Sequence, residues 1–202
     1  RRALSIGKWL MQGAPEMDFE DRNWSCLLLY ERVFGAFHGS DASEYHLVGY
    51  TTFYRRALNE LSEKELTELT PLREEVRERP GLTRLAVTQL VVLPPFWRKG
   101  HGTKMLRMIY RLARSDPSVL DVAVEGPNEA LMALRTACDA AELRELKLLK
   151  SLGAKLPPWA DLQRKSKLSM VQLFALAEYI GSEAGRAGVR YEEAEAEYIG
   201  SE

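Results

Sequence analysis

Residues 82–114, LTRLAVTQLVVLPPFWRKGHGTKMLRMIYRLAR, contain the pattern that decides the fold. An alternating apolar run comes first, a loop with two glycines follows, and an amphipathic run ends the stretch. This order predicts a strand, a glycine loop and a helix. The N-terminus of a helix that follows such a loop commonly binds a phosphate group, because its backbone N–H groups point at the ligand.

The strand predicted over residues 82–93 alternates without interruption until two prolines end it. One face carries Leu85, Val87, Val91 and Leu93, with Gln89 between them, and the other carries Arg84, Ala86, Thr88, Leu90 and Val92. The helix is expected to begin near Gly102. Its buried stripe is predicted to be Met105, Met108, Ile109, Leu112 and Ala113, and its solvated face Lys104, Arg107, Arg111 and Arg114.

The flanking segments predict the rest of a sheet. Residues 24–34 and 45–56 are rich in strand formers and predict two antiparallel strands joined by a loop over residues 35–44. Residues 119–124, VLDVAV, predict a buried strand parallel to the strand of residues 82–93. Asn128 is expected to cap a helix that runs to about residue 149. Residues 59–79 predict one or two short helices, either a solvated excursion or a lid on the substrate side.

The composition is that of a globular protein. Of 202 residues, 46% are hydrophobic and 28% charged, and a net charge of −1 gives no indication of a nucleic-acid binder. Cys26 and Cys138 have no partner pattern and are expected to be free, buried thiols in a reducing, intracellular compartment. No apolar run has the length of a membrane span. The chain begins at Arg1 rather than Met, and we take it to be a fragment.

The character of the chain changes after Gly153. Pro157 and Pro158 indicate a linker, and residues 161–180 predict a further helix. We therefore expect two parts: residues 1–153, an α/β domain, and residues 154–202, a small helical extension. The segment AEYIGSE occurs twice, at residues 177–183 and 196–202, and we have no physical account of this duplication.

The glycine loop is the first candidate site. Gly100 and Gly102 let the backbone approach a ligand closely, although a plain tight turn explains two glycines equally well. A Walker P-loop is excluded because the GK[ST] ending is absent, and a dinucleotide fingerprint is excluded because the third glycine is missing. His38 and His46 show no metal-ligand spacing, so no metal is expected.

Two motifs together carry a family resemblance. The run QLVVLPPFWRKGHGTKML resembles the coenzyme A loop of GNAT-fold N-acetyltransferases. Paired with VLDVAVEGPNEALMALR, it closely resembles the catalytic subunits of type-B histone acetyltransferases. The resemblance covers about residues 18–149, and more loosely residues 161–180. It implies a GNAT-type fold, in which helices flank a mixed, mainly antiparallel sheet, with the small helical C-terminal part as the extension of that family.

The resemblance also implies a role for each matching residue. Glu125 matches the general base of the family, and Glu31 stands where the family has a second acidic residue near the substrate lysine. Acetyl-CoA is the implied co-substrate. Its acetyl and pantetheine arm would lie along Leu90, Val91 and Val92, its pyrophosphate would be wrapped by Lys99, Gly100, His101, Gly102 and Thr103, and Asn128 would lie along the coenzyme.

This chain departs from the family pattern at two positions. Trp97 stands where the superfamily has Gln or Arg, and the neighbouring Arg98 is expected to substitute for that side chain. We therefore expect the pyrophosphate contacts to differ there. Gly126 follows the general base, where family members often have Asp, so Glu31 becomes the candidate second carboxylate.

These residues suggest a mechanism. A lysine ammonium has a pKa of about 10.4 and is a poor nucleophile at neutral pH. A carboxylate such as that of Glu125 would remove a proton as the amine attacks the thioester, directly or through a water molecule. An N–H group of Leu90 or Val92 would meet the negative thioester oxygen. No covalent intermediate is required, so Cys26 and Cys138 need no catalytic role.

We therefore expect acetyl transfer from acetyl-CoA to a lysine of a histone tail, with the tail of histone H4 as the expected acceptor. The resemblance also implies a WD-repeat histone chaperone subunit as the partner, and action in the nucleus and the cytoplasm. The first alternative is a GNAT enzyme that uses another amine, because the fold does not fix the acceptor. The second is a non-catalytic module that binds coenzyme A or a histone without turnover.

Overall fold

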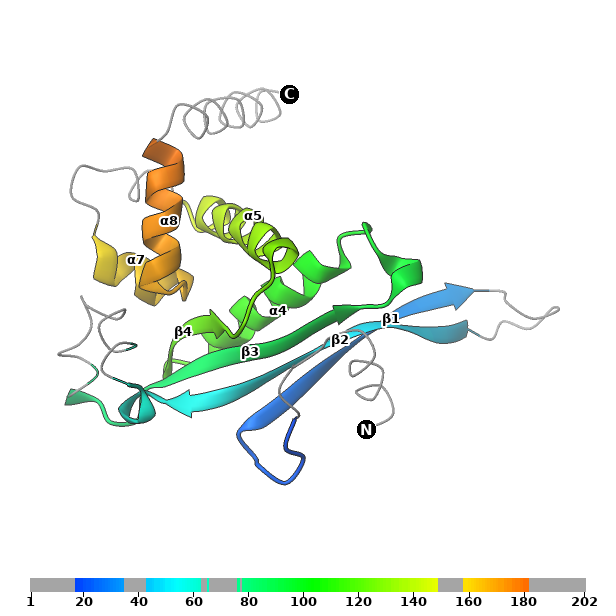
Figure 1. Cartoon of the computed structure of the whole chain (residues 1–202), viewed down its shortest axis with the longest axis horizontal. Coiled ribbons are helices and arrows are strands. Elements are labelled where there is room, and N and C mark those ends of the chain that lie inside the picture. Colours follow the sequence, from blue (N-terminus) through cyan, green and yellow to red (C-terminus); the bar gives the residue numbers. More distant parts are fainter. Residues whose placement is uncertain are drawn as a thin grey trace.

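A mixed sheet of four strands is the frame of the molecule (Figure 1). The computed structural model describes residues 17–34, 43–62, 65, 76, 78–148 and 158–181. The strand order is β1 (Trp24–Phe34), β2 (Ser43–Ala57), β3 (Thr83–Val92) and β4 (Val119–Val124). The first three strands pair antiparallel, and β4 pairs parallel to β3. These strands and their directions confirm the sequence prediction.

The helices lie together on one side of this sheet (Figure 1). They are α4 (His101–Ser115), α5 (Glu129–Glu145), α7 (Trp159–Ser166) and α8 (Met170–Gly181). Two short 3-10 turns, η1 (Leu58–Glu60) and η3 (Pro94–Phe96), follow β2 and β3. Residues 35–42 of the loop predicted over residues 35–44 lie outside the described residues, and residues 43 and 44 belong to β2. Most of the predicted helices over residues 59–79 also lie outside the described residues.

A bulge interrupts β3 at Thr88. Thr52 pairs with Gln89 and the next residue, Phe53, pairs with Val87, so Thr88 has no opposite residue on β2. The Thr88 hydroxyl instead contacts the Thr52 hydroxyl at 2.8 Å. The predicted uninterrupted alternation is therefore wrong. Leu90 joins Leu85 and Val87 in packing against the main core, because the extra residue shifts the phase of the strand.

The buried face of α4 differs from the predicted stripe. Leu106 and Tyr110 are fully buried, whereas Met108 and Leu112 are exposed. Met108 lines a half-open groove of about 390 Å³ between β1 and α4. The predicted solvated face is also wrong in part, because Arg107 and Arg114 both bind the buried carboxylate of Glu142 on α5. The packing of α5 against α4 rotates the buried face toward α5.

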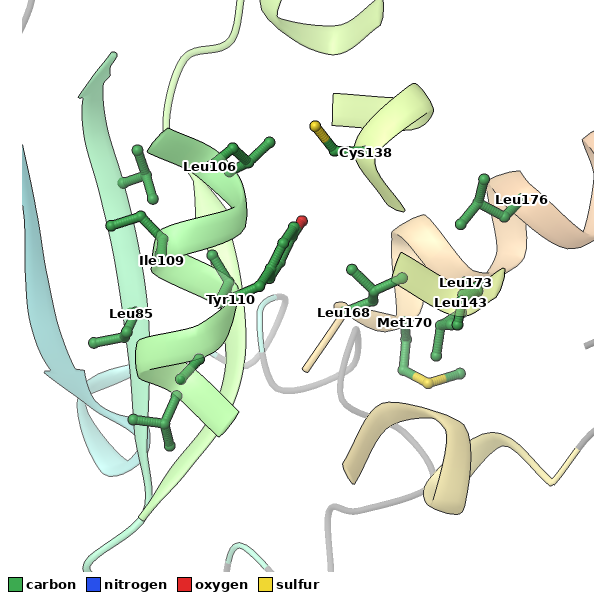
Figure 2. Close-up of a cluster of buried hydrophobic side chains, with 14 of the residues drawn as sticks. Leu85, Leu106, Ile109, Tyr110, Cys138, Leu143, Leu168, Met170, Leu173 and Leu176 are labelled. Atoms are coloured by element: carbon green, nitrogen blue, oxygen red, sulfur yellow. The ribbon is translucent and has the colours of Figure 1, made fainter. Parts of the chain in front are cut away.

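One core joins the sheet to all four helices (Figure 2). Its buried side chains include Leu85 from β3, Ile109 and Tyr110 from α4, Cys138 and Leu143 from α5, Leu162 from α7, and Leu173 and Leu176 from α8. The segment between α7 and α8 also reaches β4, where Val122 N donates to Lys167 O at 2.9 Å. The helices beyond residue 154 thus share the core of the sheet. The division into two domains at residue 153 remains a prediction.

Candidate active site

The loop before α4 turns sharply at two left-handed residues. Arg98 has φ 59° and Gly100, the N-cap of α4, has φ 75°. Such a φ is strained for most residues but not for glycine, which accounts for Gly100. A Cβ at Gly102 would lie 3.1 Å from Leu134 Cδ2 on α5, so a larger residue there would require the Leu134 side chain to move. The left-handed turn at Gly100 and the close packing at Gly102 are structural features that sequence spacing alone did not distinguish from ligand binding.

The first turn of α4 has free hydrogen-bonding groups. Its first backbone bond runs from Lys104 N to Gly100 O at 3.1 Å, and no side chain caps it, so the N–H groups of the first residues have no partner from the helix. His101 is buried, and neither of its ring nitrogens has a hydrogen-bond partner among the described residues. Lys99 Nζ lies 5.5 Å from the Phe96 ring centroid, beside this turn. Free donors and a nearby cation at a helix N-terminus fit an anionic group such as a pyrophosphate.

The second half of β3 has an open edge. Leu93 N donates to Val48 O on β2, so by strand alternation Val91 also faces β2, and the backbone groups of Leu90 and Val92 point to the other side. On that side β4 ends its pairing at Val87, whose carbonyl accepts the final bond, from Glu125 N at 2.9 Å. The chain then turns away at Gly126, which has φ 53°. Among the described residues, no strand pairs with this edge.

Trp97 partly covers the open edge. Its indole Nε1 donates to Val92 O at 2.6 Å, while 58% of the residue remains exposed. The carbonyl of Val92 is therefore engaged by Trp97. The N–H of Val92 and both backbone groups of Leu90 have no side-chain hydrogen-bond partner among the described residues. Trp97, which departs from the superfamily pattern, thus occupies one backbone acceptor of the strand edge that was predicted to line the co-substrate.

Glu125 lies at the carboxyl end of β4, on the sheet face that points away from α4. Its chain neighbour Val124 packs against the main core, so the Glu125 side chain points to the opposite face. Glu125 Oε1 accepts a 2.6 Å hydrogen bond from the Tyr54 hydroxyl on β2. Burial, followed by this bond to the carboxylate, raises the pKa of Tyr54 to about 12. Sequence reasoning missed Tyr54, because only the strand register brings residues so far apart in the sequence together.

Glu31 lies far from Glu125. Glu125 N bonds to Val87 O, Val87 pairs with Phe53 on β2, and Phe53 pairs with Ser25 on β1. Ser25 is therefore the β1 residue level with Glu125, and Glu31 follows Ser25 by six residues. At about 3.3 Å per residue this is roughly 20 Å along the sheet. Glu31 is also exposed on the edge strand of the described sheet. The structure does not bring the two predicted carboxylates together, so the role of Glu31 near a substrate remains a separate prediction.

Asn128 caps α5, as predicted. Its Oδ1 accepts a hydrogen bond from Leu131 N at 2.9 Å. The cap holds the turn that follows Glu125, because α5 begins directly after it. A contact of Asn128 with the coenzyme remains a prediction, since the side-chain oxygen already serves the helix.

The two cysteines are free, and neither is activated. Cys138 is buried in the core, and burial raises the pKa of its thiol to about 11. Burial also raises the pKa of Cys26. Both thiols are therefore protonated at neutral pH. In the part of the chain that the structure describes, no group of three or more His, Cys, Asp or Glu side chains could hold a metal ion, and no helix has the length and apolarity to cross a bilayer.

Comparison with known proteins gives a consistent result. The profile of the acetyltransferase (GNAT) family matches residues 4–138. Similar proteins include the histone acetyltransferase type B catalytic subunit of Aspergillus oryzae, 32% identical over 176 residues that cover 86% of this chain and 34% of the relative. The same subunit of Emericella nidulans is 33% identical over 62% of this chain and 26% of the relative. The human subunit is 27% identical over 63% of this chain and 25% of the relative. The chain spans about a third or less of the length of the curated relatives it matches.

Proposed function

The chain belongs to the acetyltransferase (GNAT) family, and from this premise we propose that it transfers the acetyl group of acetyl-CoA to a histone lysine side chain. The open mixed sheet with its flanking helices agrees with the predicted GNAT-type fold. The histone as acceptor is supported by the names of the relatives, which are histone acetyltransferase type B catalytic subunits. Because the chain spans only part of those relatives, acceptor and activity are proposals for this chain.

One observation carries the proposal. A carboxylate, that of Glu125, lies where β4 leaves β3, at the beginning of the open edge that runs toward the loop and first turn of α4. This combination offers a proton acceptor, an unpaired strand edge and an anion-binding helix end in one region. An acyl transfer from a phosphate-bearing thioester to an amine needs each of these three elements.

In the proposed binding mode, the N-terminal turn of α4 holds the pyrophosphate of acetyl-CoA. The N–H groups of Gly102 and Thr103 donate to it, and Lys99 and Arg98 supply positive charge. Gly100 and His101 shape the same turn. The open edge of β3 at Leu90, Val91 and Val92 lines the pantetheine arm, with Trp97 covering the Val92 carbonyl.

Acetyl-CoA supplies a thioester, whose carbonyl carbon forms the new C–N bond as the C–S bond breaks. The carboxylate of Glu125 accepts the proton that the lysine amine must lose, directly or through a water molecule. The N–H of Leu90 or Val92 donates to the carbonyl oxygen as negative charge develops there. Neither cysteine takes part, because both thiols are protonated at neutral pH.

The finer features follow from the family resemblance alone. We propose the N-terminal tail of histone H4 as the acceptor, Glu31 as an acidic contact for substrate, and a WD-repeat histone chaperone as the partner subunit. We propose action in the nucleus and the cytoplasm on the same basis.

The test is an acetylation assay with labelled acetyl-CoA and a histone H4 tail peptide. The wild type is compared with Glu125→Gln and with the control Glu129→Gln, whose carboxylate is exposed in the first turn of α5. We expect Glu125→Gln to lower kcat by about 10² to 10⁴, as for removal of a general base, and Glu129→Gln to leave it unchanged. Full activity of Glu125→Gln would exclude Glu125 as the base.

Two further arms separate the alternatives. Transfer to polyamines but not to the peptide would support a GNAT enzyme with another acceptor. Binding of acetyl-CoA, measured by calorimetry, without transfer to any amine would support a non-catalytic module.

A further inference from the structure

We propose that Tyr54 is a positioning residue for Glu125, holding one carboxylate oxygen so that the other receives the proton from the substrate amine. This inference rests on the proposed function, in which Glu125 is the base. Tyr54 donates to Oε1 at 2.6 Å, and Oε2 has no hydrogen-bond partner among the described residues. The two oxygens of the carboxylate are therefore not equivalent.

The sheet is built so that this contact can form. Tyr54 pairs with Ala86 on β3, and Ala86 pairs with Ala123 on β4, so the three residues form one row across three strands. Glu125 follows Ala123 by two residues and lies on the same face. Tyr54 and β4 are two strand spacings apart, about 10 Å. Only alanine methyl groups stand in the row between them, which leaves the phenol ring free to extend over β3 to the carboxylate.

Trp24 holds the phenol ring from the other side. Trp24 is the β1 partner of Tyr54, and the two rings stack with centroids 4.9 Å apart and an interplanar angle of 29°. The ring of Tyr54 is thus flanked by an indole on one side and by the carboxylate of Glu125 at its end. Stacked aromatic rings and β-sheet neighbours restrict the rotation of the side chain. The hydroxyl is therefore presented to Glu125 in a fixed direction.

The raised pKa of Tyr54 identifies this residue as the hydrogen-bond donor to Glu125. Since burial and the bond to Glu125 raise the pKa of Tyr54 to about 12, the phenol keeps its proton at every pH at which the enzyme would work. It donates to the carboxylate and does not act as an acid or a base itself. The expected effect of Tyr54 is therefore orientation of the carboxylate.

A purely structural role makes a different prediction. If Tyr54 served only to pack against Trp24, Tyr54→Phe would keep the ring and leave kcat unchanged. The positioning role predicts that loss of one oxygen atom lowers kcat. It also predicts little change in KM for acetyl-CoA, because Tyr54 lies on the face opposite α4, whose first turn is the proposed pyrophosphate site.

The experiment compares wild type, Tyr54→Phe and the control Tyr45→Phe, an exposed tyrosine on the same strand. We expect Tyr54→Phe to lower kcat at neutral pH roughly tenfold, as for a hydrogen bond to a charged group. We expect KM for acetyl-CoA to stay within about twofold of the wild-type value. Tyr45→Phe should match the wild type. An unchanged kcat in Tyr54→Phe would overturn the proposal.

A second measurement does not depend on turnover. In protein carrying 13C-labelled glutamate carboxyl groups, the resonance of Glu125 is assigned by its loss in Glu125→Gln. We expect Tyr54→Phe, and not Tyr45→Phe, to shift this resonance at constant neutral pH. No shift would refute the contact even if the variant were inactive. Conversely, Tyr54→Phe could shift the Glu125 resonance while the wild type acetylates no amine. This result would refute the proposed function and leave the Tyr54 contact established.

Discussion

Val122 of β4 and Leu168, between α7 and α8, form an isolated parallel bridge at the free edge of β4. Val122 N donates to Lys167 O at 2.9 Å, and Lys167 Nζ donates to Val119 O at 2.6 Å. The C-terminal segment therefore contributes backbone hydrogen bonds and core side chains to β4, which ends directly before Glu125.

This arrangement predicts the result of a truncation. A chain cut after residue 153 loses Leu162, Leu168 and Leu173 from the core, and the loss of one buried leucine alone typically costs about 2–5 kcal/mol. We expect this chain to show no cooperative unfolding transition in urea, followed by circular dichroism. A chain cut after Gly181, which keeps α7 and α8, is the reference. A cooperative transition in the shorter chain would instead support residues 1–153 as an independent domain.

Asp139 predicts a pH dependence of stability. This carboxyl group is buried between α4 and α5, where it accepts a hydrogen bond from Tyr110, and burial raises its pKa from 3.8 to about 6. A raised folded pKa means that the native state favours the protonated form. The stabilising contribution is therefore complete below about pH 4 and is lost as the pH rises to about 6. The loss is on the order of 2–3 kcal/mol.

The check is the variant Asp139→Asn, which keeps an acceptor oxygen for Tyr110. We expect the free energy of unfolding, from urea titrations between pH 4 and 7, to lose this downward slope in the variant. Asp161→Asn is the control, because Asp161 is exposed in the first turn of α7. An equal slope in wild type and Asp139→Asn would show that Asp139 is not the group responsible.

Trp97 predicts a change in co-substrate binding. Trp97→Gln removes the indole from the Val92 carbonyl and restores a residue type that the superfamily has there. If the open edge of β3 lines the pantetheine arm, the freed carbonyl gains a hydrogen bond to it, and the Kd for coenzyme A falls by about threefold to tenfold. Isothermal calorimetry measures this without turnover. Trp97→Phe, which frees the carbonyl but supplies no amide, separates the two effects, and equal Kd values in all three proteins would contradict the prediction.

Much of the fold was predictable because its signals are local. The β-branched run at residues 119–124 and the proline pair after Leu93 fixed two strand ends, and Asn128 was correctly predicted to cap α5. These features depend on backbone propensity and on the hydrogen bonds of near neighbours in the chain. Such preferences act before any tertiary contact forms.

The structure differs from the sequence prediction where a tertiary contact determines which side chains are buried or paired. Periodicity on α4 could not show that α5 would bury Leu106 and Tyr110 rather than Met108, nor that Glu142 would recruit Arg107. The same holds for the candidate site. The sequence motifs predicted Glu125 and the loop at Gly100 as site residues. The hydrogen bond of Tyr54 to Glu125 depends on the strand register, which a single sequence does not reveal.

The bulge at Thr88 has a consequence for how this site tolerates insertions and deletions. The open edge consists of backbone groups of Leu90 and Val92, whose place is set by their pairing with Thr51 and Gly49 on β2. Deleting Thr88 would join Val87, the partner of Phe53, directly to Gln89, the partner of Thr52, and would leave the other pairs of the ladder unchanged. Leu90 and Val92 would therefore keep their backbone groups at the open edge after this deletion. The bulge is thus a position at which the chain can lose one residue without losing the accessible edge.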